Sequence, residues 1–178
     1  MARFDPTTGA VRVFTFKEGM LSALAHDLEI VVGRFAIDVA DDLAIDARFE
    51  AGSLTVAHAI KDGHPSDALG ASDKKKIEQT IAGDVLDARR FPEIRFVAPA
   101  PEPSGDGFLY RGQLTLHGKT RPVEARSRAT NGTQVAEIVL HQPDFGIKPY
   151  SAMLGALKIK PDIRVRIALP WVQPASAP

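Results

Sequence analysis

The chain has 178 residues, of which 44% are hydrophobic, 25% charged and 7% aromatic, values typical of one soluble globular domain. They exclude collagen-like, coiled-coil and disordered chains. No cysteine is present, which excludes disulfides, thiolate metal sites and a cysteine nucleophile. Lys+Arg and Asp+Glu each number 22, so the chain lacks the basic field that nucleic-acid binding requires.

The balanced charge hides a gradient along the chain. Residues 1–60 carry 5 Lys/Arg against 9 Asp/Glu, whereas residues 121–178 carry 8 against 4. The gradient is too diffuse for a polybasic tail. We interpret it as strands whose outer faces carry opposite charges.

The N-terminal residues contain no apolar run of the length that a signal peptide needs, and no stretch approaches the roughly 18 apolar residues of a membrane span. We therefore expect a cytoplasmic protein, or a periplasmic one if a leader ahead of Met1 has been removed. Residues 171–178 are rich in proline and are expected to form a flexible tail after a single domain that spans the chain.

Alternation of apolar and polar residues dominates the chain and predicts about eight antiparallel strands. Leu43, Ile45, Ala47 and Phe49, for example, share one face of their segment. The expected strands are Val11–Phe16, Leu28–Val39, Leu43–Glu50, Ile94–Val97, Phe108–Leu116, Val123–Ala129, Gln134–Gln142 and Ile163–Leu169.

Short turn sequences connect neighbouring strands. Asn131-Gly132 is a strong two-residue hairpin signal, and we favour this interpretation over a glycosylation site. His117-Gly118 and Asp41-Asp42 mark two further turns. Because parallel pairing needs crossovers of a dozen or more residues, these short connections predict a meander.

One segment has helical periodicity. Ile77, Ile81 and Val85 recur every fourth residue and predict a helix over Ser72–Asp87, with Ser72-Asp73 as its N-cap. We interpret Lys74–Lys76 in its first turn as a solvated face rather than a phosphate contact. A second short helix is expected at Gly19–Ala25.

Eight antiparallel strands can close as a barrel or a sandwich, and the length favours a barrel. A barrel of this size is filled by side chains or holds one small ligand. Gly112, on the same face as Tyr110, is expected to leave space for a ligand chain. The side chains expected to line the interior are Phe49, Phe96, Tyr110, Leu114, Leu116, Ile163 and Val165.

Motifs for common catalytic chemistry are missing, including G-x-S-x-G, the P-loop, the Rossmann fingerprint and H-E-x-x-H. His58, Asp62 and His64 lie in a predicted loop, but their spacing fits no usual metal-ligand pattern. His26-Asp27 is a candidate acid/base pair inside an apolar stretch, with a histidine bonded to a backbone carbonyl as the favoured alternative.

Three residues near the ends of apolar segments could meet the polar head of a ligand: His26, His141 and Tyr150. Basic residues toward the C-terminus alternate with Ile163, Val165 and Ile167 and are expected to face solvent. They are Lys158, Lys160, Arg164 and Arg166.

Three motifs carry a resemblance to a known family. Phe91–Phe96 (FPEIRF), Tyr110–Val123 (YRGQLTLHGKTRPV) and Pro143–Ile147 (PDFGI) follow one another in the order and spacing of the YceI-like, polyisoprenoid-binding family. His26 with Gly33–Phe35 is similar to an earlier stretch of the same family. The resemblance covers about residues 10–170.

This resemblance implies an all-β fold, an extended eight-stranded antiparallel lipocalin-like barrel with one or two short helices. It also implies non-catalytic binding of an amphiphilic lipid, such as a polyisoprenoid or isoprenoid quinone precursor, with no covalently required cofactor. His26 coincides with the family's histidine, although the sequence of Ala25–Leu28 departs from the commonest form of that motif. An enzyme using His26 in the same cavity, a plugged barrel acting through a protein partner, and a homodimer stay open.

Overall fold

The computed structural model describes residues 1–19 and 25–170. The helix expected at Gly19–Ala25 therefore falls largely outside the described residues, as does the expected tail at 171–178.

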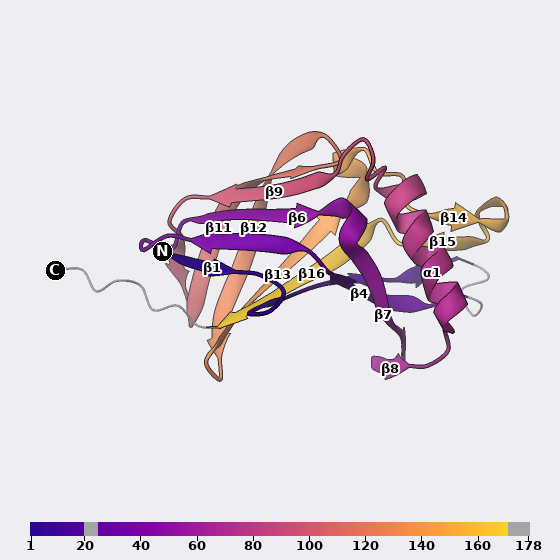
Figure 1. Cartoon of the computed structure of the whole chain (residues 1–178), viewed down its shortest axis with the longest axis horizontal. Coiled ribbons are helices and arrows are strands. Elements are labelled where there is room, and N and C mark those ends of the chain that lie inside the picture. Colours follow the sequence, from indigo (N-terminus) through magenta and orange to yellow (C-terminus); the bar gives the residue numbers. More distant parts are fainter. Residues whose placement is uncertain (20–24, 171–178) are drawn as a thin grey trace.

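Within residues 1–19 and 25–170, thirteen strands form one antiparallel sheet that curls around an apolar interior (Figure 1). Nearly all of the sequence-predicted strands lie within it, and the long strands β11, β12, β13 and β16 form the predicted meander. The strands of this sheet are β1 (Ala2–Phe4), β2 (Ala10–Thr15), β4 (Asp27–Val32), β5 (Phe35–Val39), β6 (Ile45–Glu50), β7 (Leu54–Lys61), β8 (His64–Ser66), β9 (Glu93–Ala98), β10 (Glu102–Ser104), β11 (Gly107–Leu116), β12 (Lys119–Thr130), β13 (Thr133–His141) and β16 (Asp162–Pro170).

A bent hairpin over residues 27–61 closes the sheet on itself. β4 pairs with β7 and β5 pairs with β6, while the backbones of Gly33 and Arg34 bond across to Ser53 and Glu50. On its two sides this hairpin pairs with β9, through β6, and with β2, through β4. When each bent strand is counted once and the short strands β1, β8 and β10 are set aside, eight of the described strands remain, in the all-β antiparallel class that the sequence predicts.

The sequence-based expectation of one strand over Leu28–Val39 is wrong, because the chain bends between β4 and β5. A Cβ at Gly33 would lie 2.9 Å from the Ser53 carbonyl oxygen, so the bend brings two backbones closer than most residues allow. The next strand begins at Ile45 rather than Leu43, whose φ of 67° belongs to the preceding turn.

β7 and β8 are missing from the sequence-based expectation. A register shift between Glu29 and Ile30 interrupts the β4–β7 ladder and breaks the period-2 pattern of β7, so that both Val56 and Ala59 are buried. His58, Asp62 and His64 consequently lie on a β7–β8 hairpin rather than in an open loop. No cluster of possible metal ligands occurs among the described residues.

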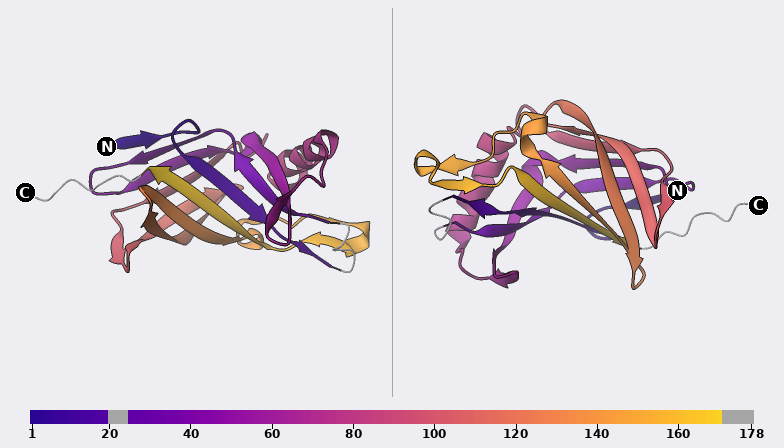
Figure 2. Two further views of the ribbon diagram at one scale, coloured as in Figure 1. Left: turned by 90° about the horizontal axis from the view of Figure 1, so that it is seen from below. Right: turned by 180° about the vertical axis from the view of Figure 1, so that it is seen from behind.

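The predicted helix is present as α1 (Ala71–Thr80), which continues into a π-helical turn, η3 (Ile81–Val85). The helix begins at Ala71, one residue earlier than expected, and its N-cap is Gly70, so the predicted Ser72-Asp73 cap is wrong. Glu78 accepts a hydrogen bond from the Val56 N–H at 2.8 Å, and Lys74 donates one to the Ala57 carbonyl at 2.8 Å. These bonds fix α1 against β7 at one end of the barrel (Figure 2).

A separate three-stranded sheet lies at the same end of the molecule as α1 (Figure 1). It contains β3 (Lys17–Glu18), β14 (Ser151–Ala152) and β15 (Leu157–Ile159). Three short 3-10 turns complete the part of the fold that the structure describes: η2 (Ala51–Ser53), η4 (Gln142–Phe145) and η5 (Met153–Gly155).

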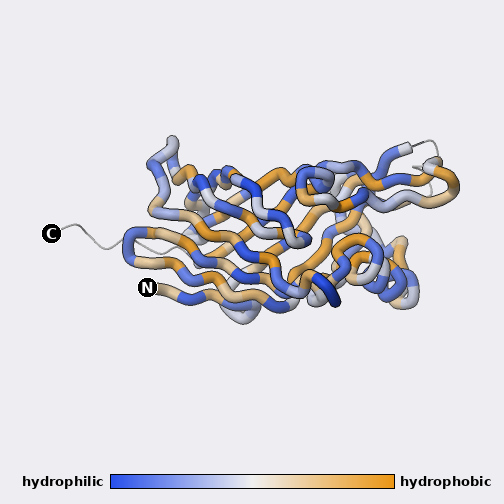
Figure 3. The backbone as a smooth tube through the Cα atoms, turned by 90° about the horizontal axis from the view of Figure 1, so that it is seen from above, coloured by the Kyte–Doolittle hydropathy of each residue, from blue (hydrophilic) through white to orange (hydrophobic). Residues whose placement is uncertain are grey.

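Two predicted turns are confirmed by their backbone angles. Asn131 and Gly132 have φ values of 49° and 75°, and His117 and Gly118 have values of 52° and 71°, as a two-residue hairpin with two left-handed positions requires. The tube in Figure 3 shows hydrophobic and hydrophilic residues alternating along the strands. Ile30 and Ile37 are among the most buried side chains of the resulting core.

Candidate functional site

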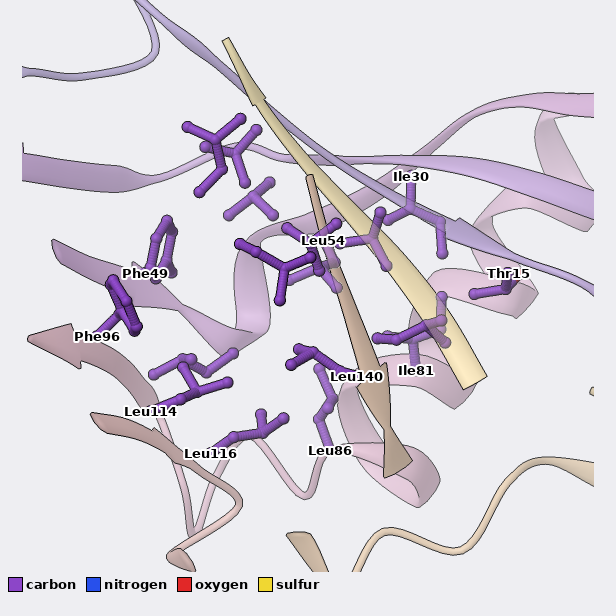
Figure 4. Close-up of a pocket in the computed structure, with 18 of the residues that line it drawn as sticks. Thr15, Ile30, Phe49, Leu54, Ile81, Leu86, Phe96, Leu114, Leu116 and Leu140 are labelled. Carbon is purple, nitrogen blue, oxygen red and sulfur yellow. The ribbon is translucent and has the colours of Figure 1, made fainter. Parts of the chain in front are cut away.

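The barrel encloses a cavity of about 620 Å³, within the range of small-molecule sites. The inward faces of the strands form its wall, and Figure 4 shows Phe49, Phe96 and Leu114 on one side and Thr15 with Ile81 on the other. All seven side chains that the alternation assigns to the interior line this cavity. They are Phe49, Phe96, Tyr110, Leu114, Leu116, Ile163 and Val165.

Gly112 plays a different part from the one expected. A Cβ at this position would lie 2.5 Å from the Phe96 ring and 2.6 Å from the Val97 carbonyl oxygen. The space that the sequence seemed to offer a ligand beside Gly112 is therefore occupied by Phe96. The glycine lets this ring lie against the backbone of β11, so a larger residue here would disturb the fold rather than fill the cavity.

His141 also lies elsewhere than expected. Its side chain is exposed, and its Nδ1 lies 2.6 Å from the Asp162 carboxylate on the neighbouring strand β16. The next residue, Gln142, is buried and lines the cavity, and its amide donates to the Lys160 carbonyl at 3.1 Å. The inward position at the end of β13 thus belongs to Gln142, because adjacent residues face opposite sides.

One end of the cavity reaches the surface beside α1, and we call this end the mouth. Asp73 and Lys76 of α1 are exposed and also line the cavity. His26 and Tyr150, two of the predicted head-group residues, line the cavity as well. Nearby on β2, Thr15 has a buried hydroxyl with no hydrogen-bond partner among the described residues.

The structure separates His26 from its proposed acid/base partner. The Asp27 carboxylate accepts a hydrogen bond from the Lys17 N–H at 2.7 Å and so ties β4 to β3. Asp27 is therefore engaged in holding two strands together, while His26 lines the cavity.

The far end of the cavity, beside the β12–β13 hairpin and away from α1 (Figure 1), carries three polar side chains. Tyr110, Ser127 and Gln134 all line the wall, and the Gln134 amide donates to the Ser127 hydroxyl at 2.6 Å. The other amide atom, Gln134 Oε1, is buried without a partner among the described residues. Burial raises the pKa of Tyr110 to about 12, which keeps its hydroxyl protonated.

We call Tyr110, Ser127 and Gln134 the far polar cluster. Sequence reasoning included Tyr110 and missed the other two, although strict alternation along β12 and β13 places both on the inward face. Two small inward residues, Ala125 and Ala136, flank them on these strands. Among the described residues that line the cavity, the only Asp, Glu, Lys or Arg side chains are Asp73 and Lys76, at the mouth.

The motifs that carry the family resemblance contribute Phe96, Leu114 and Ile147, among others, to the cavity wall, and four of their other residues meet outside it. The Phe91 and His117 rings contact each other at a tilt of 55° with centroids 4.5 Å apart, and His117 Nδ1 lies 3.3 Å from the Phe145 carbonyl oxygen. A Cβ at Gly118 would lie 2.6 Å from Phe91. We call Phe91, His117, Gly118 and Phe145 the signature corner, and its contacts are structural.

An antiparallel barrel closed around an apolar cavity, with its charged lining residues confined to the mouth, defines a lipocalin-like β-barrel. The chain belongs to the YceI-like domain family, whose sequence profile matches residues 3–170.

Curated relatives carry the name UPF0312 protein. The one from Pseudomonas fluorescens is 31% identical over 103 residues, which cover 53% of this chain and 44% of the relative. The one from Pseudomonas savastanoi pv. phaseolicola is 29% identical over 133 residues, covering 65% of this chain and 59% of the relative. The matched part thus spans only about half of each relative.

Two solved structures share the fold. BcnA of Burkholderia cenocepacia has a TM-score of 0.61 at 16% identity and covers 92% of this chain and 96% of its own. A polyisoprenoid binding domain from Saccharophagus degradans has a TM-score of 0.59 at 10% identity, and the match covers 95% of this chain and 97% of that domain. Within the residues that the structure describes, no helix is long and apolar enough to cross a membrane.

Proposed function

We propose that this protein binds and carries an amphiphilic lipid with a long apolar chain, of the polyisoprenoid class, without catalysing a reaction on it. The observation that carries the proposal is the cavity of about 620 Å³, whose wall is apolar along most of the barrel. The polyisoprenoid binding domain from Saccharophagus degradans supports the choice of ligand class, because it shares this fold.

Apolar burial alone gives such a ligand modest affinity. A chain burying about 300 to 400 Å² gains roughly 8 to 10 kcal/mol at about 25 cal/mol per Å². Association consumes several kcal/mol of that gain. Micromolar or tighter binding therefore needs polar contacts as well, and the cavity offers them at both ends.

The two ends suit different head groups. The mouth combines His26 with the exposed Lys76 and is open to water, so we propose that it holds a charged head such as a phosphate. In the far polar cluster Tyr110 and Ser127 are buried and no member is a cation, so a charged head there would be heavily penalised. An uncharged hydroxyl could donate a hydrogen bond to Gln134 Oε1 at little cost.

The carrier proposal is favoured over catalysis by the arrangement of His26 and Asp27. A general base needs an orienting partner, and the Asp27 carboxylate is bonded to the Lys17 N–H instead. The remaining polar groups on the wall are spread between opposite ends of the cavity rather than gathered around one reacting position.

Lipid extraction tests the proposal. Protein purified without detergent is extracted with organic solvent, and the extract is analysed by mass spectrometry beside a mock purification. We expect an isoprenoid lipid that is enriched with the protein, and added polyprenol should bind to protein that has been stripped of lipid. Recovery of no lipid, together with no binding of prenyl alcohols, phosphates or quinones, would overturn it.

A further inference from the structure

The turn between β14 and β15 exposes large apolar side chains to solvent. Met153 is 61% exposed and Leu154 is fully exposed, at 109%. Both residues have left-handed backbone angles, with φ values of 54° and 55°, which is uncommon for side chains of this size. We call Met153 and Leu154 the apolar tip.

The apolar tip lies beside the mouth of the cavity. Tyr150, Leu157 and Ile159, which flank the turn on both sides, line the cavity. β15 also pairs with β3, which follows β2 and Thr15 directly along the chain. Figures 1 and 2 show β14 and β15 projecting beyond the barrel at the end that carries α1.

Lysines predominate in the segment that carries the tip and in the strand paired with it. Residues 148–160 contain Lys148, Lys158 and Lys160, all exposed, and no acidic residue. The paired strand β3 adds Lys17 and the single acidic residue Glu18, which is the register partner of Lys158. The two segments therefore carry four lysines against one glutamate.

We propose that the apolar tip docks on an anionic lipid bilayer. Exposed apolar side chains enter the headgroup region, while neighbouring lysines are attracted to anionic lipids. The inference rests on the proposed function: docking would place the mouth against the membrane from which a lipid ligand leaves or to which it returns. Two apolar side chains and a few lysines give weak, reversible binding, as shuttling requires.

A second copy of this chain is a less suitable occupant. Stable interfaces bury about 1,200 to 2,000 Å² in total, far more than two side chains at a narrow turn supply. The lysines around both tips would also repel each other across a symmetric contact.

Vesicle sedimentation tests the docking. Wild type, a Met153→Ser/Leu154→Ser double variant and a Lys158→Glu/Lys160→Glu double variant are mixed with phosphatidylcholine vesicles, with or without about one third phosphatidylglycerol. Val139→Ser is the matched control, because Val139 is 65% exposed on the outer face of β13. Circular dichroism checks that each variant is folded.

We expect wild type and Val139→Ser to sediment with the anionic vesicles, less so in high salt, and both double variants to bind at least about tenfold more weakly. The docking would be overturned if wild type did not bind vesicles, or if Val139→Ser lost as much vesicle binding as the tip variant. It would also be overturned if wild type were a dimer in solution and the tip variant a monomer.

The same proteins, titrated with a soluble short-chain prenyl alcohol, separate the two proposals. Isoprenoid binding without vesicle binding would refute the docking alone. Vesicle binding without isoprenoid binding would refute the carrier function and leave the docking supported. Intact isoprenoid affinity in the tip variants would show that their loss of vesicle binding is local to the tip.

Discussion

At the scale of single residues, Gln134 is the side chain that we propose distinguishes a ligand with a hydroxyl head from a plain hydrocarbon. Its Oε1 is buried at the far end without a partner among the described residues, while its Nε2 is satisfied by Ser127. A buried acceptor of this kind is costly until a water molecule or a ligand hydroxyl donates a hydrogen bond to it.

Replacing Gln134 by leucine tests whether this side chain provides the preference for a hydroxyl head. Wild type should bind a prenyl alcohol about fivefold to tenfold more tightly than the hydrocarbon of equal length, since one neutral hydrogen bond contributes about 1 kcal/mol. Gln134→Leu should bind both equally, as measured by calorimetric titration, whereas His26→Phe should keep the preference. An unchanged preference in Gln134→Leu would mean that the alcohol does not reach the far polar cluster.

His26 is tested with a charged head at the mouth. His26→Phe should weaken binding of a prenyl phosphate by up to about 3 kcal/mol, because hydrogen bonds to charged groups are the stronger ones. Binding of the matched hydrocarbon should change little, and competition against a fluorescent fatty chain measures both. Equal weakening of the two ligands would identify His26 as a packing residue.

Tyr110 offers a spectroscopic test of the far end. The chain has two tyrosines, so Tyr150→Phe leaves Tyr110 alone. Because burial raises its pKa to about 12, its absorbance should show little tyrosinate at pH 10 to 11 and titrate above that range. The neutral form is favoured in the folded state, so this contribution to stability is present below the unfolded pKa of about 10 and is lost as the pH rises through 12. Titration near 10 in folded protein would show that water reaches the hydroxyl freely.

At the scale of elements, the signature corner shows that part of each recognisable motif stabilises the fold rather than lining the cavity. Gly118 has a φ of 71° and packs against Phe91, so the turn between β11 and β12 holds the loop that precedes β9. The corner fixes one end of the barrel without touching its contents.

Gly118→Ala should therefore destabilise the fold by about 1 to 3 kcal/mol through backbone strain, with a further loss from the contact with Phe91. Gly132→Ala is the matched control, because Gly132 has a φ of 75° in a similar turn but nothing within 4 Å of an added Cβ. Urea unfolding measures both. Equal losses in the two variants would show that Phe91 contributes nothing through this turn.

The long strands were predictable because inward and exposed residues alternate over Tyr110–Leu114 of β11 and Asp162–Ile167 of β16. The bent hairpin was not predictable, because its break at Gly33 depends on the approach of Ser53 from a distant part of the sequence. β7 was missed for a related reason, since a bulge shifts its inward face partway along the strand.

At the scale of the whole molecule, the number of strands and the length of the chain were enough to predict a closed barrel and an apolar interior. The polar ends were harder to predict. His141 and Gln142 are adjacent polar residues where β13 ends, so polarity alone does not show which of them faces inward. The register with β16 pairs His141 with Asp162 on the outside and leaves Gln142 facing inward. Gly112 was misjudged because its apparent space depends on Phe96 of another strand.

The most direct test of an apolar chain inside the barrel is a titration of wild type, Leu114→Trp and Val139→Trp with one long-chain prenyl alcohol. Leu114 is buried on the cavity wall, whereas Val139 is exposed on the outer face of the sheet. Circular dichroism and urea unfolding establish that all three proteins are folded. We expect Leu114→Trp to fill the cavity and bind at least about tenfold more weakly than wild type, with Val139→Trp unchanged. Equal affinities in all three proteins would contradict the account, because the chain would then lie outside the barrel.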